Sequence, residues 1–235
     1  IYDETNPLSD DQLLESFDLS HLPIDFQIKA REMFSKYLDT FSRHNKDIGL
    51  TKDLEMHIEL KPGSGINIQR YTPLAHNIRE EIAKAIDQLH HFNIIRICEE
   101  PSNYVSNLIA VRKKDNSVRV IFDGRPVNMD TIQEATNFTT QHEVFAHLAK
   151  KEHVTTIDLS DAFFQIPLSA ESQPYTAFYA NGRRYCFTRA PQGLRNSPNN
   201  LKRLMEKLFG DLPDTIIHYV DDILIATNGS LDDHL

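Results

Sequence analysis

The chain has 235 residues, of which 40% are hydrophobic and 25% charged, with 8 Gly and 11 Pro. This composition is typical of a globular chain with a sizeable core, and it excludes collagen-like, low-complexity and mostly disordered proteins. No window approaches the roughly 18 unbroken apolar residues that a membrane span needs, so we expect no membrane partner. The acidic first twenty residues do not resemble a signal peptide. Two cysteines, Cys98 and Cys186, are too few for a disulfide framework, which favours reduced thiols and a cytoplasmic protein.

The net charge of −9 is unevenly distributed along the chain. Residues 1–60 hold 13 acids and 6 bases, a balance of −7, whereas the remainder holds 21 acids and 19 bases, a balance of −2. Within the remainder, residues 179–210 carry seven Lys and Arg side chains against a single acid, Glu206. A locally basic stretch of this kind is compatible with an anionic partner, although the whole chain is acidic.

Hydrophobic periodicity predicts the elements in chain order. Apolar residues at helical spacing predict helices over 23–44, 73–91, 141–151 and from 197 to 208. Runs with a period of two, or of continuous apolar residues, predict strands over 94–97, 105–111, 118–122, 154–159 and 216–225. Because strands and helices mix without a regular strand–helix–strand repeat, the expected fold class is α+β with an antiparallel sheet.

The last predicted strand run is interrupted by two adjacent acids, Asp221 and Asp222. Buried unpaired carboxylates are costly, so the acids fit best at the tip of a tight β-hairpin. Taken in isolation, the pair is better explained as a plain exposed Asp-Asp turn. Asp158, at the end of the predicted strand 154–159, is explained structurally as a helix N-cap. Together, however, the three acids form a set of oxygen ligands suited to hard divalent cations, which catalyse phosphoryl transfer when held in pairs.

Four segments resemble motifs of reverse transcriptases, in the order and spacing of that family. Tyr219-Val220-Asp221-Asp222 resembles the signature hairpin, and Ile157-Asp158-Leu159 with the following Ala162-Phe163-Phe164 resembles the first catalytic-aspartate motif. Residues 190–198 resemble the Pro-Gln-Gly…Ser-Pro segment, and residues 119–128 resemble the fingers motif Asp-aromatic-Arg-x-x-Asn. The overall pattern is similar to Pol polyproteins of gypsy-like LTR retrotransposons or retroviral elements. Two departures are Gly124, where the family usually has an aromatic residue, and residues 199–201, where an aromatic residue often follows Ser-Pro.

The resemblance implies a polymerase palm, an antiparallel sheet backed by helices, with inserted fingers and without the thumb. It divides the chain into an acidic N-terminal extension or linker (1–61), fingers (62–132 and 166–196) and palm (133–165 and 197–235). The expected activity is RNA-directed DNA synthesis from dNTPs on a primer 3′-hydroxyl, with two Mg²⁺ ions that Mn²⁺ can replace. The expected partners are RNA and DNA template-primers and the rest of a Pol polyprotein: protease, thumb and connection, RNase H and integrase. The expected location of the protein is the cytoplasm, with association with virus-like particles or the nucleus as alternatives.

The resemblance also assigns roles to individual residues. The catalytic and metal-binding set is Asp158, Asp221 and Asp222, with the Leu159 carbonyl completing the metal shell. The nucleotide-binding set is Lys113, Arg119, Asp161, Ala162, Phe163 and Gln192, in which Phe163 is a steric gate against ribonucleotides. The template- and primer-binding set is Arg125, Asn128, Gly193 and Tyr219.

Two alternative functions stay open at this point. An RNA-dependent RNA polymerase shares a palm with paired acids, but that class usually has Gly rather than Val before them and lacks Pro-Gln-Gly. An inactive remnant of a retroelement would bind nucleic acid or serve in assembly without catalysis. A zinc site is not expected, because the histidines lack a metal-ligand spacing; those considered are His90, His91, His142, His147 and His153.

Overall fold

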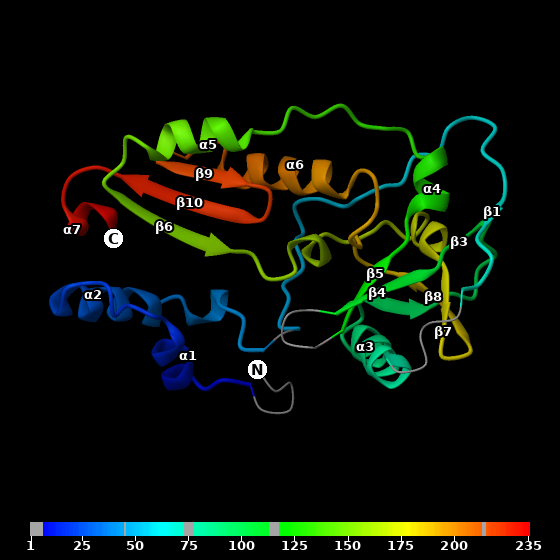
Figure 1. Ribbon diagram of the computed structural model, residues 1–235, viewed down its shortest axis with the longest axis horizontal. Coiled ribbons are helices and arrows are strands. Elements are labelled where there is room, and N and C mark those ends of the chain that lie inside the picture. Colours follow the sequence, from blue (N-terminus) through cyan, green and yellow to red (C-terminus); the bar gives the residue numbers. More distant parts are fainter. Residues whose placement is uncertain (1–6, 45, 73–77, 113–117, 213–214) are drawn as a thin grey trace. The chain divides into compact units, whose positions relative to one another are not determined.

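The computed structural model describes residues 7–44, 46–72, 78–112, 118–212 and 215–235. The chain divides into two compact units, each assembled from segments that are distant in sequence (Figure 1). Unit 1 consists of Ile1–Gly49, Phe138–Ser160 and Phe209–Leu235, and unit 2 consists of Leu50–Asn137 and Asp161–Leu208. The division into fingers and palm segments stays a prediction. Among the described residues, no helix is long and apolar enough to cross a membrane.

A three-stranded antiparallel sheet forms the centre of unit 1, with the strand order β6-β10-β9 (Figure 1). Its strands are β6 (His153–Asp158), β9 (Ile216–Tyr219) and β10 (Asp222–Thr227). The central strand β10 carries the buried residues Ile223, Leu224 and Ala226, as expected for a strand with a neighbour on both sides. The predicted strand run 216–225 is therefore two strands joined by a tight turn.

Three helices of unit 1 begin at capping boxes, whereas the helix that follows Pro23, described below, begins without a side-chain cap. Helix α5 (Gln141–Leu148) starts at a capping box in which Thr140 and Glu143 each satisfy a backbone N–H of the other, as the sequence predicts. It ends three residues before the predicted end. Helix α1 (Asp10–Ser16) starts at an equivalent capping box, and α7 (Leu231–His234) closes the chain.

The helix predicted over 23–44 is shorter in the structure. Helix α2 (Ile24–Ser35) is followed by a 3-10 turn, η1 (Leu38–Thr40). This break lets Phe41 fold back, so that the rings of Phe17, Phe34 and Phe41 lie with centroids 4.6–5.7 Å apart. Burial of three aromatic rings outweighs the continued helical periodicity. An ion pair between Lys29 and Asp232 joins α2 to α7.

In the part of unit 2 that the structure describes there are three small sheets. The strand orders are β2-β8-β7, β4-β5 and β1-β3, of which only the last is parallel. The strands are β1 (Asn67–Ile68), β2 (Ile95–Ile97), β3 (Tyr104–Val105), β4 (Leu108–Arg112), β5 (Val118–Phe122), β7 (Phe178–Ala180) and β8 (Arg183–Phe187). The helices and 3-10 turns are α3 (Arg79–His91), α4 (Arg125–Asp130), η3 (Ala162–Gln165), η4 (Gln173–Thr176) and α6 (Ser197–Phe209). The last residue of α6, Phe209, is also the residue at which the third segment of unit 1 begins.

The strand predicted over 105–111 is interrupted at two residues. Ser106 leaves the ladder to donate its N–H to the Ala177 carbonyl, 2.8 Å away. The Asn107 side chain donates to the Arg70 carbonyl and accepts from the Thr72 N–H, at 2.9 and 3.2 Å. Because both residues bond to distant segments, β3 and β4 are separate strands. The predicted start of the helix that ends at His91 and the hairpin loop 113–117 lie outside the described residues.

The core of unit 2 is formed by large side chains with less than 2% of their surface exposed. They come from α3, β2, β3, α4, β7, α6 and connecting segments: Met56, Ile86, Ile94, Ile95, Tyr104, Val127, Ile166, Leu168, Phe178, Leu201 and Met205. Cys98 and Cys186 are free and buried beside Ala177, and burial raises the pKa of the Cys186 thiol to about 12. This thiol is therefore protonated at neutral pH.

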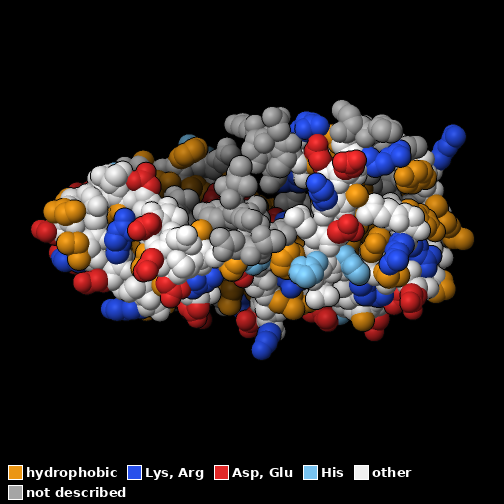
Figure 2. Space-filling view, turned by 90° about the horizontal axis from the view of Figure 1, so that it is seen from below, with side chains coloured by type: hydrophobic (Ala, Val, Ile, Leu, Met, Phe, Trp, Pro, Cys, Tyr) orange, Lys and Arg blue, Asp and Glu red, His pale blue; other side chains and the backbone are white. Residues whose placement is uncertain are grey.

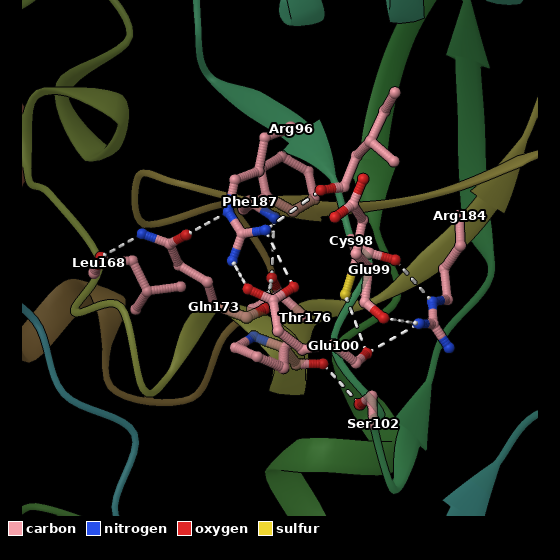
Figure 3. Close-up of polar contacts among 12 residues, drawn as sticks. Arg96, Cys98, Glu99, Glu100, Ser102, Leu168, Gln173, Thr176, Arg184 and Phe187 are labelled. Atoms are coloured by element: carbon pink, nitrogen blue, oxygen red, sulfur yellow. Dashed lines mark hydrogen bonds and ion pairs between the residues drawn. The ribbon is translucent and has the colours of Figure 1, made fainter.

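Two arginines hold the loop that follows β2 (Figure 3). The Arg96 guanidinium donates to both Glu100 carboxylate oxygens and to the Gln173 side chain, and its bond to Glu100 lowers the pKa of that carboxyl to about 2. Arg184 donates to the carbonyls of Cys98, Glu99 and Glu100. One arginine of the basic stretch is thus part of the structural framework.

Candidate active site

The acid pair lies at the tip of the β9–β10 hairpin. Tyr219 and Asp222 are paired across the ladder, so Val220 and Asp221 alone form the turn. Val220 has φ 56°, in the left-handed region that β-branched residues rarely adopt. Such a strained residue persists only where the surrounding structure holds it, and strain of this kind is concentrated at functional sites. The predicted position of the acids at a hairpin tip is confirmed.

Asp158 ends β6 directly opposite Asp222 on β10. The ladder continues one step further, because the Leu159 N–H donates to the Asp221 carbonyl at 3.1 Å. Like charges opposite each other in an antiparallel pair are destabilising by a few tenths of a kcal/mol or more. Asp158 is exposed and Asp222 half-buried, so the sheet places two carboxylates next to each other where solvent reaches them.

The donor set suits a hard divalent cation, because it consists of carboxylate and carbonyl oxygens from Asp158, Leu159, Asp221 and Asp222. Among the residues that the structure describes, however, no group of three or more His, Cys, Asp or Glu side chains converges into a metal site. The backbone pairing of β6, β9 and β10 nevertheless brings these donor residues to one end of the sheet.

The segment from Asp161 onward belongs to unit 2 and begins with a sharp turn. Asp161 has φ 46°, which short polar residues tolerate in the left-handed region, and η3 follows immediately. Within η3, the Phe164 ring stacks on Phe187 with centroids 6.2 Å apart, and the Phe164 carbonyl accepts a hydrogen bond from Arg189. Phe163 is half-buried and precedes this anchored residue, while Ala162 is buried.

The backbone of the Pro-Gln-Gly segment touches the strand end that precedes α4. A Cβ on Gly193, which has φ 104°, would lie 2.2 Å from the Phe122 carbonyl oxygen, and a Cβ on Gly124 would lie 2.3 Å from the Gly193 oxygen. Both contacts are with backbone atoms and cannot be relieved by a side-chain movement. Gly124 therefore permits this close approach, which accounts for the departure from the aromatic residue of the motif.

Asn128 fixes the same segment with both ends of its amide. Its Nδ2 donates to the Gly193 carbonyl at 2.7 Å, and its Oδ1 accepts from the Arg195 N–H at 2.8 Å. These bonds use one donor and the acceptor of the side chain. Asn128 thus holds the Pro-Gln-Gly loop in place.

Arg125, at the start of α4, forms a forked ion pair with Asp123. Its Nε and Nη2 donate to the two carboxylate oxygens at 2.8 and 2.6 Å. The Asp123 side chain is 4% exposed, whereas that of Arg125 is 79% exposed. The guanidinium lowers the pKa of the Asp123 carboxyl to about 2, so the carboxylate stays ionised at neutral pH. The outer edge of the guanidinium faces solvent.

The predicted site residues are divided between the two units. Unit 1 holds the three aspartates, Leu159 and the half-buried Tyr219. Unit 2 holds the residues predicted for nucleotide and template: Arg119, Arg125, Asn128, Asp161, Ala162, Phe163, Gln192 and Gly193. Arg119 is exposed on β5, opposite Val111, and Gln192 is half-buried. Lys113 lies outside the described residues.

Much of the basic stretch is bonded within unit 2. On α6, Lys202 bonds to the Asn137 carbonyl and Glu206, Arg203 pairs with Glu134, and Lys207 pairs with Asp53. Figure 2 shows acidic and basic side chains interspersed over the face drawn. The composition of the stretch alone therefore overstates the charge that it offers to an anionic partner.

Comparison with known families decides the assignment. The reverse transcriptase (RNA-dependent DNA polymerase) family matches residues 111–235. The chain belongs to the reverse transcriptase family. Reverse transcriptases are generally dependent on divalent metal ions, which agrees with the oxygen donors at the hairpin tip.

Two curated relatives are retroelement polyproteins. The chain is 30% identical over 225 residues to the retrovirus-related Pol polyprotein from transposon 297 of Drosophila melanogaster, an alignment covering 93% of this chain and 21% of the relative. It is 26% identical over 214 residues to the polyprotein from transposon 412 of the same organism, covering 87% of this chain and 17% of the relative. The chain thus spans about a fifth of the length of these relatives.

Two solved structures show the same fold as this reverse transcriptase chain. The crystal structure of the CSH mutant of the prototype foamy virus protease-reverse transcriptase has a TM-score of 0.80 and 25% identity, covering 94% of this chain and 29% of that one. A foamy viral protease-reverse transcriptase in complex with an RNA/DNA hybrid has a TM-score of 0.82 and 23% identity, covering 97% and 31%. The expected α+β polymerase fold is confirmed.

Sequence reasoning missed two residues of this reverse transcriptase chain that support the predicted site residue Arg125: Asp123 contacts it directly, and Gln69 contacts Asp123. Asp123 was part of a motif without a role of its own, and Gln69 belonged to no motif. The signal for Asp123 was an acid two residues before an arginine at the end of an apolar strand. Gln69 had no sequence signal, because its partners Asp123 and Asn107 are distant in the chain.

Proposed function

We propose that this chain is the part of an RNA-directed DNA polymerase that carries out nucleotidyl transfer from a dNTP to a primer 3′-hydroxyl. The observation that carries the proposal is the placement of Asp158 opposite Asp222, with Asp221 in the adjoining two-residue turn, in a member of the reverse transcriptase family. Such a cluster of acids has a functional explanation, since it is destabilising for the sheet alone.

Asp158, Asp221, Asp222 and the Leu159 carbonyl would hold two Mg²⁺ ions, for which Mn²⁺ can substitute. When bound, these ions lower the pKa of the attacking hydroxyl and neutralise the leaving pyrophosphate. The 3′-hydroxyl oxygen attacks the α-phosphorus, and the bond to the pyrophosphate oxygen breaks.

The residues of unit 2 would bind the nucleotide. Lys113 and Arg119 would contact the triphosphate, because an ammonium and a planar guanidinium both suit phosphate oxygens. The backbone at Asp161 and Ala162, together with Gln192, would line the rest of the pocket. Phe163 would exclude a 2′-hydroxyl, and the anchored Phe164 supports the backbone that carries it.

Arg125, Asn128, Gly193 and Tyr219 would serve the template and primer. Arg125 fits direct contact with a phosphodiester, since its guanidinium is 79% exposed and fixed by Asp123. Asn128 would act indirectly by holding Gly193 and Arg195. Gly193 would allow the template strand to approach the backbone.

The proposed partners are RNA and DNA template-primers and the other domains of a Pol polyprotein. Two similar foamy viral structures are complexes with an RNA/DNA hybrid and with double-stranded DNA. Location in the cytoplasm is proposed on composition alone.

Primer extension by the full-length polymerase tests the function. With a DNA primer on an RNA template, dNTPs and Mg²⁺, we expect DNA products up to the template end. RNA products made from NTPs would instead indicate an RNA-dependent RNA polymerase. Retention of the template-primer in a gel-shift assay without any extension would indicate an inactive remnant.

A further inference from the structure

Gln69, in the extended chain after β1, bonds two segments with its side-chain amide. Its Nε2 donates to Oδ2 of Asp123 at 3.0 Å, and its Oε1 accepts from the Asn107 N–H at 2.8 Å. Its own N–H donates to the Val105 carbonyl at 2.9 Å. The orientation of this amide is therefore set at both ends.

The Asp123 carboxylate receives four hydrogen bonds in one orientation. Arg125 supplies three donors, its Nε, Nη2 and backbone N–H, at 2.8, 2.6 and 3.3 Å. Gln69 supplies the fourth. A carboxylate has about four lone-pair sites, and a buried one must have them satisfied. Without Gln69, Oδ2 of this buried group would lose a donor that comes from outside the 123–125 turn.

The paired guanidinium retains three N–H donors. A guanidinium has five, and the fork to Asp123 uses one on Nε and one on Nη2. The remaining donors lie on the exposed edge of a side chain that would otherwise sample many rotamers. Fixing that edge reduces the entropy lost when a phosphate binds.

We propose that Gln69 is a positioning residue for template binding: through Asp123 it fixes the guanidinium of Arg125 toward a phosphodiester of the template strand. This inference rests on the proposed function, because it requires Arg125 to contact the template. A purely structural role for Gln69, bridging Asn107 to the 123–125 turn, is the competing explanation.

The variant Gln69→Glu separates the two explanations. Its carboxylate can still accept from the Asn107 N–H, but it also faces the Asp123 carboxylate. The repulsion raises the pKa of the new Glu, so at lower pH the protonated form donates to Asp123 as Gln does. Template affinity of Gln69→Glu should therefore be weak at about pH 8 and return toward the parent value at about pH 6. The parent protein and the control Gln88→Glu, on the exposed face of α3, should not show this recovery.

Template-primer dissociation constants of the full-length polymerase, measured against salt, give the main readout. Arg125→Ala should weaken binding about tenfold and reduce the slope of log K against log salt by about one phosphate contact. Gln69→Leu should weaken binding at least about threefold with an unchanged KM for dNTP. Gln88→Leu should match the parent. If Gln69→Leu does not fold, Gln69→Glu measured at the two pH values replaces it.

A double-mutant cycle decides the inference. If Gln69 acts through Arg125, adding Gln69→Leu to Arg125→Ala causes no further loss of template affinity. Additive losses, or a Gln69→Glu affinity that does not change with pH, would overturn the positioning role while leaving the proposed function intact. A parent-like affinity and salt slope for Arg125→Ala in an active enzyme would overturn the template contact itself. Absence of extension by the parent enzyme would instead contradict the proposed function.

Discussion

Asp158 and Asp222 are direct cross-strand partners in the β6–β10 ladder, two carboxylates opposite each other on neighbouring strands. Stability alone does not select such a pair, because like charges in this position repel. Val220, in the turn beside it, adds a second unfavourable feature with its left-handed backbone. Two locally unfavourable features therefore meet at the hairpin tip, where we propose the catalytic site.

Replacing one member of the pair should raise stability and reduce activity together. In Asp222→Asn the like-charge repulsion with Asp158 disappears, so we expect the free energy of unfolding to rise by about 0.5 kcal/mol. Primer extension should fall. Thermal and denaturant unfolding of the full-length polymerase measure the first effect, with the exposed Asp211→Asn as control. A less stable Asp222→Asn would show that the pair is not repulsive in the folded protein.

The close backbone contact at Gly124 predicts a sharp difference between alanine variants at Gly124 and at Gly65, which lies in open space. Gly124→Ala places a Cβ against the Gly193 carbonyl oxygen and should lower the free energy of unfolding by about 2 kcal/mol or more. Gly65→Ala should be neutral or slightly stabilising, since no atom lies within 4 Å of its Cβ position. Equal unfolding midpoints for the two variants would refute the contact between residues 124 and 193.

Adjacent phenylalanines should have separable roles. Phe163→Val should raise ribonucleotide incorporation about tenfold, or about 1.4 kcal/mol of differential barrier, with a modest loss of dNTP use. Phe164→Val should lower the melting temperature without changing sugar preference, because it removes the stacking on Phe187. Competition between NTPs and dNTPs in single-nucleotide extension measures the preference. Identical selectivity in both variants would make Phe163 a core residue.

Acid should weaken unit 2 through Asp123. Arg125 lowers the pKa of this carboxyl to about 2 in the folded protein, below its ordinary value of 3.8. The bond therefore stabilises the fold fully above about pH 4, and this contribution of about 2 kcal/mol is lost as the pH falls toward 2. Denaturant unfolding at pH 7 and at pH 2.5 should show a smaller pH-dependent loss in Asp123→Asn than in the parent. An equal loss in both would place the acid sensitivity elsewhere.

The elements that could be predicted from sequence are those whose signals are local. The Thr140–Glu143 capping box, the Ser197-Pro198 helix start and the acids at the hairpin tip all depend on residues within a few positions of one another. The position of Asp158 at a strand end also followed from its apolar neighbours.

What escaped prediction depends on contacts between distant segments. Helix α2 stops early because Phe41 packs on Phe17, and the 105–111 run breaks because Ser106 bonds to Ala177. The departure from the motif at Gly124 is explained by the Gly193 carbonyl, which belongs to a distant segment and lies beside it. Gln69 could not be identified at all, because its role arises from Asp123, 54 positions away.

The measurement that tests the central claim most directly is RNA-templated primer extension by Asp158→Asn in the full-length polymerase, alongside a gel-shift assay with the same template-primer. We predict that extension is almost abolished while template-primer affinity remains close to that of the parent, because binding depends on many phosphate contacts. Substantial DNA synthesis by Asp158→Asn would contradict the assignment of Asp158, and with it the catalytic site at the β6–β10 ladder.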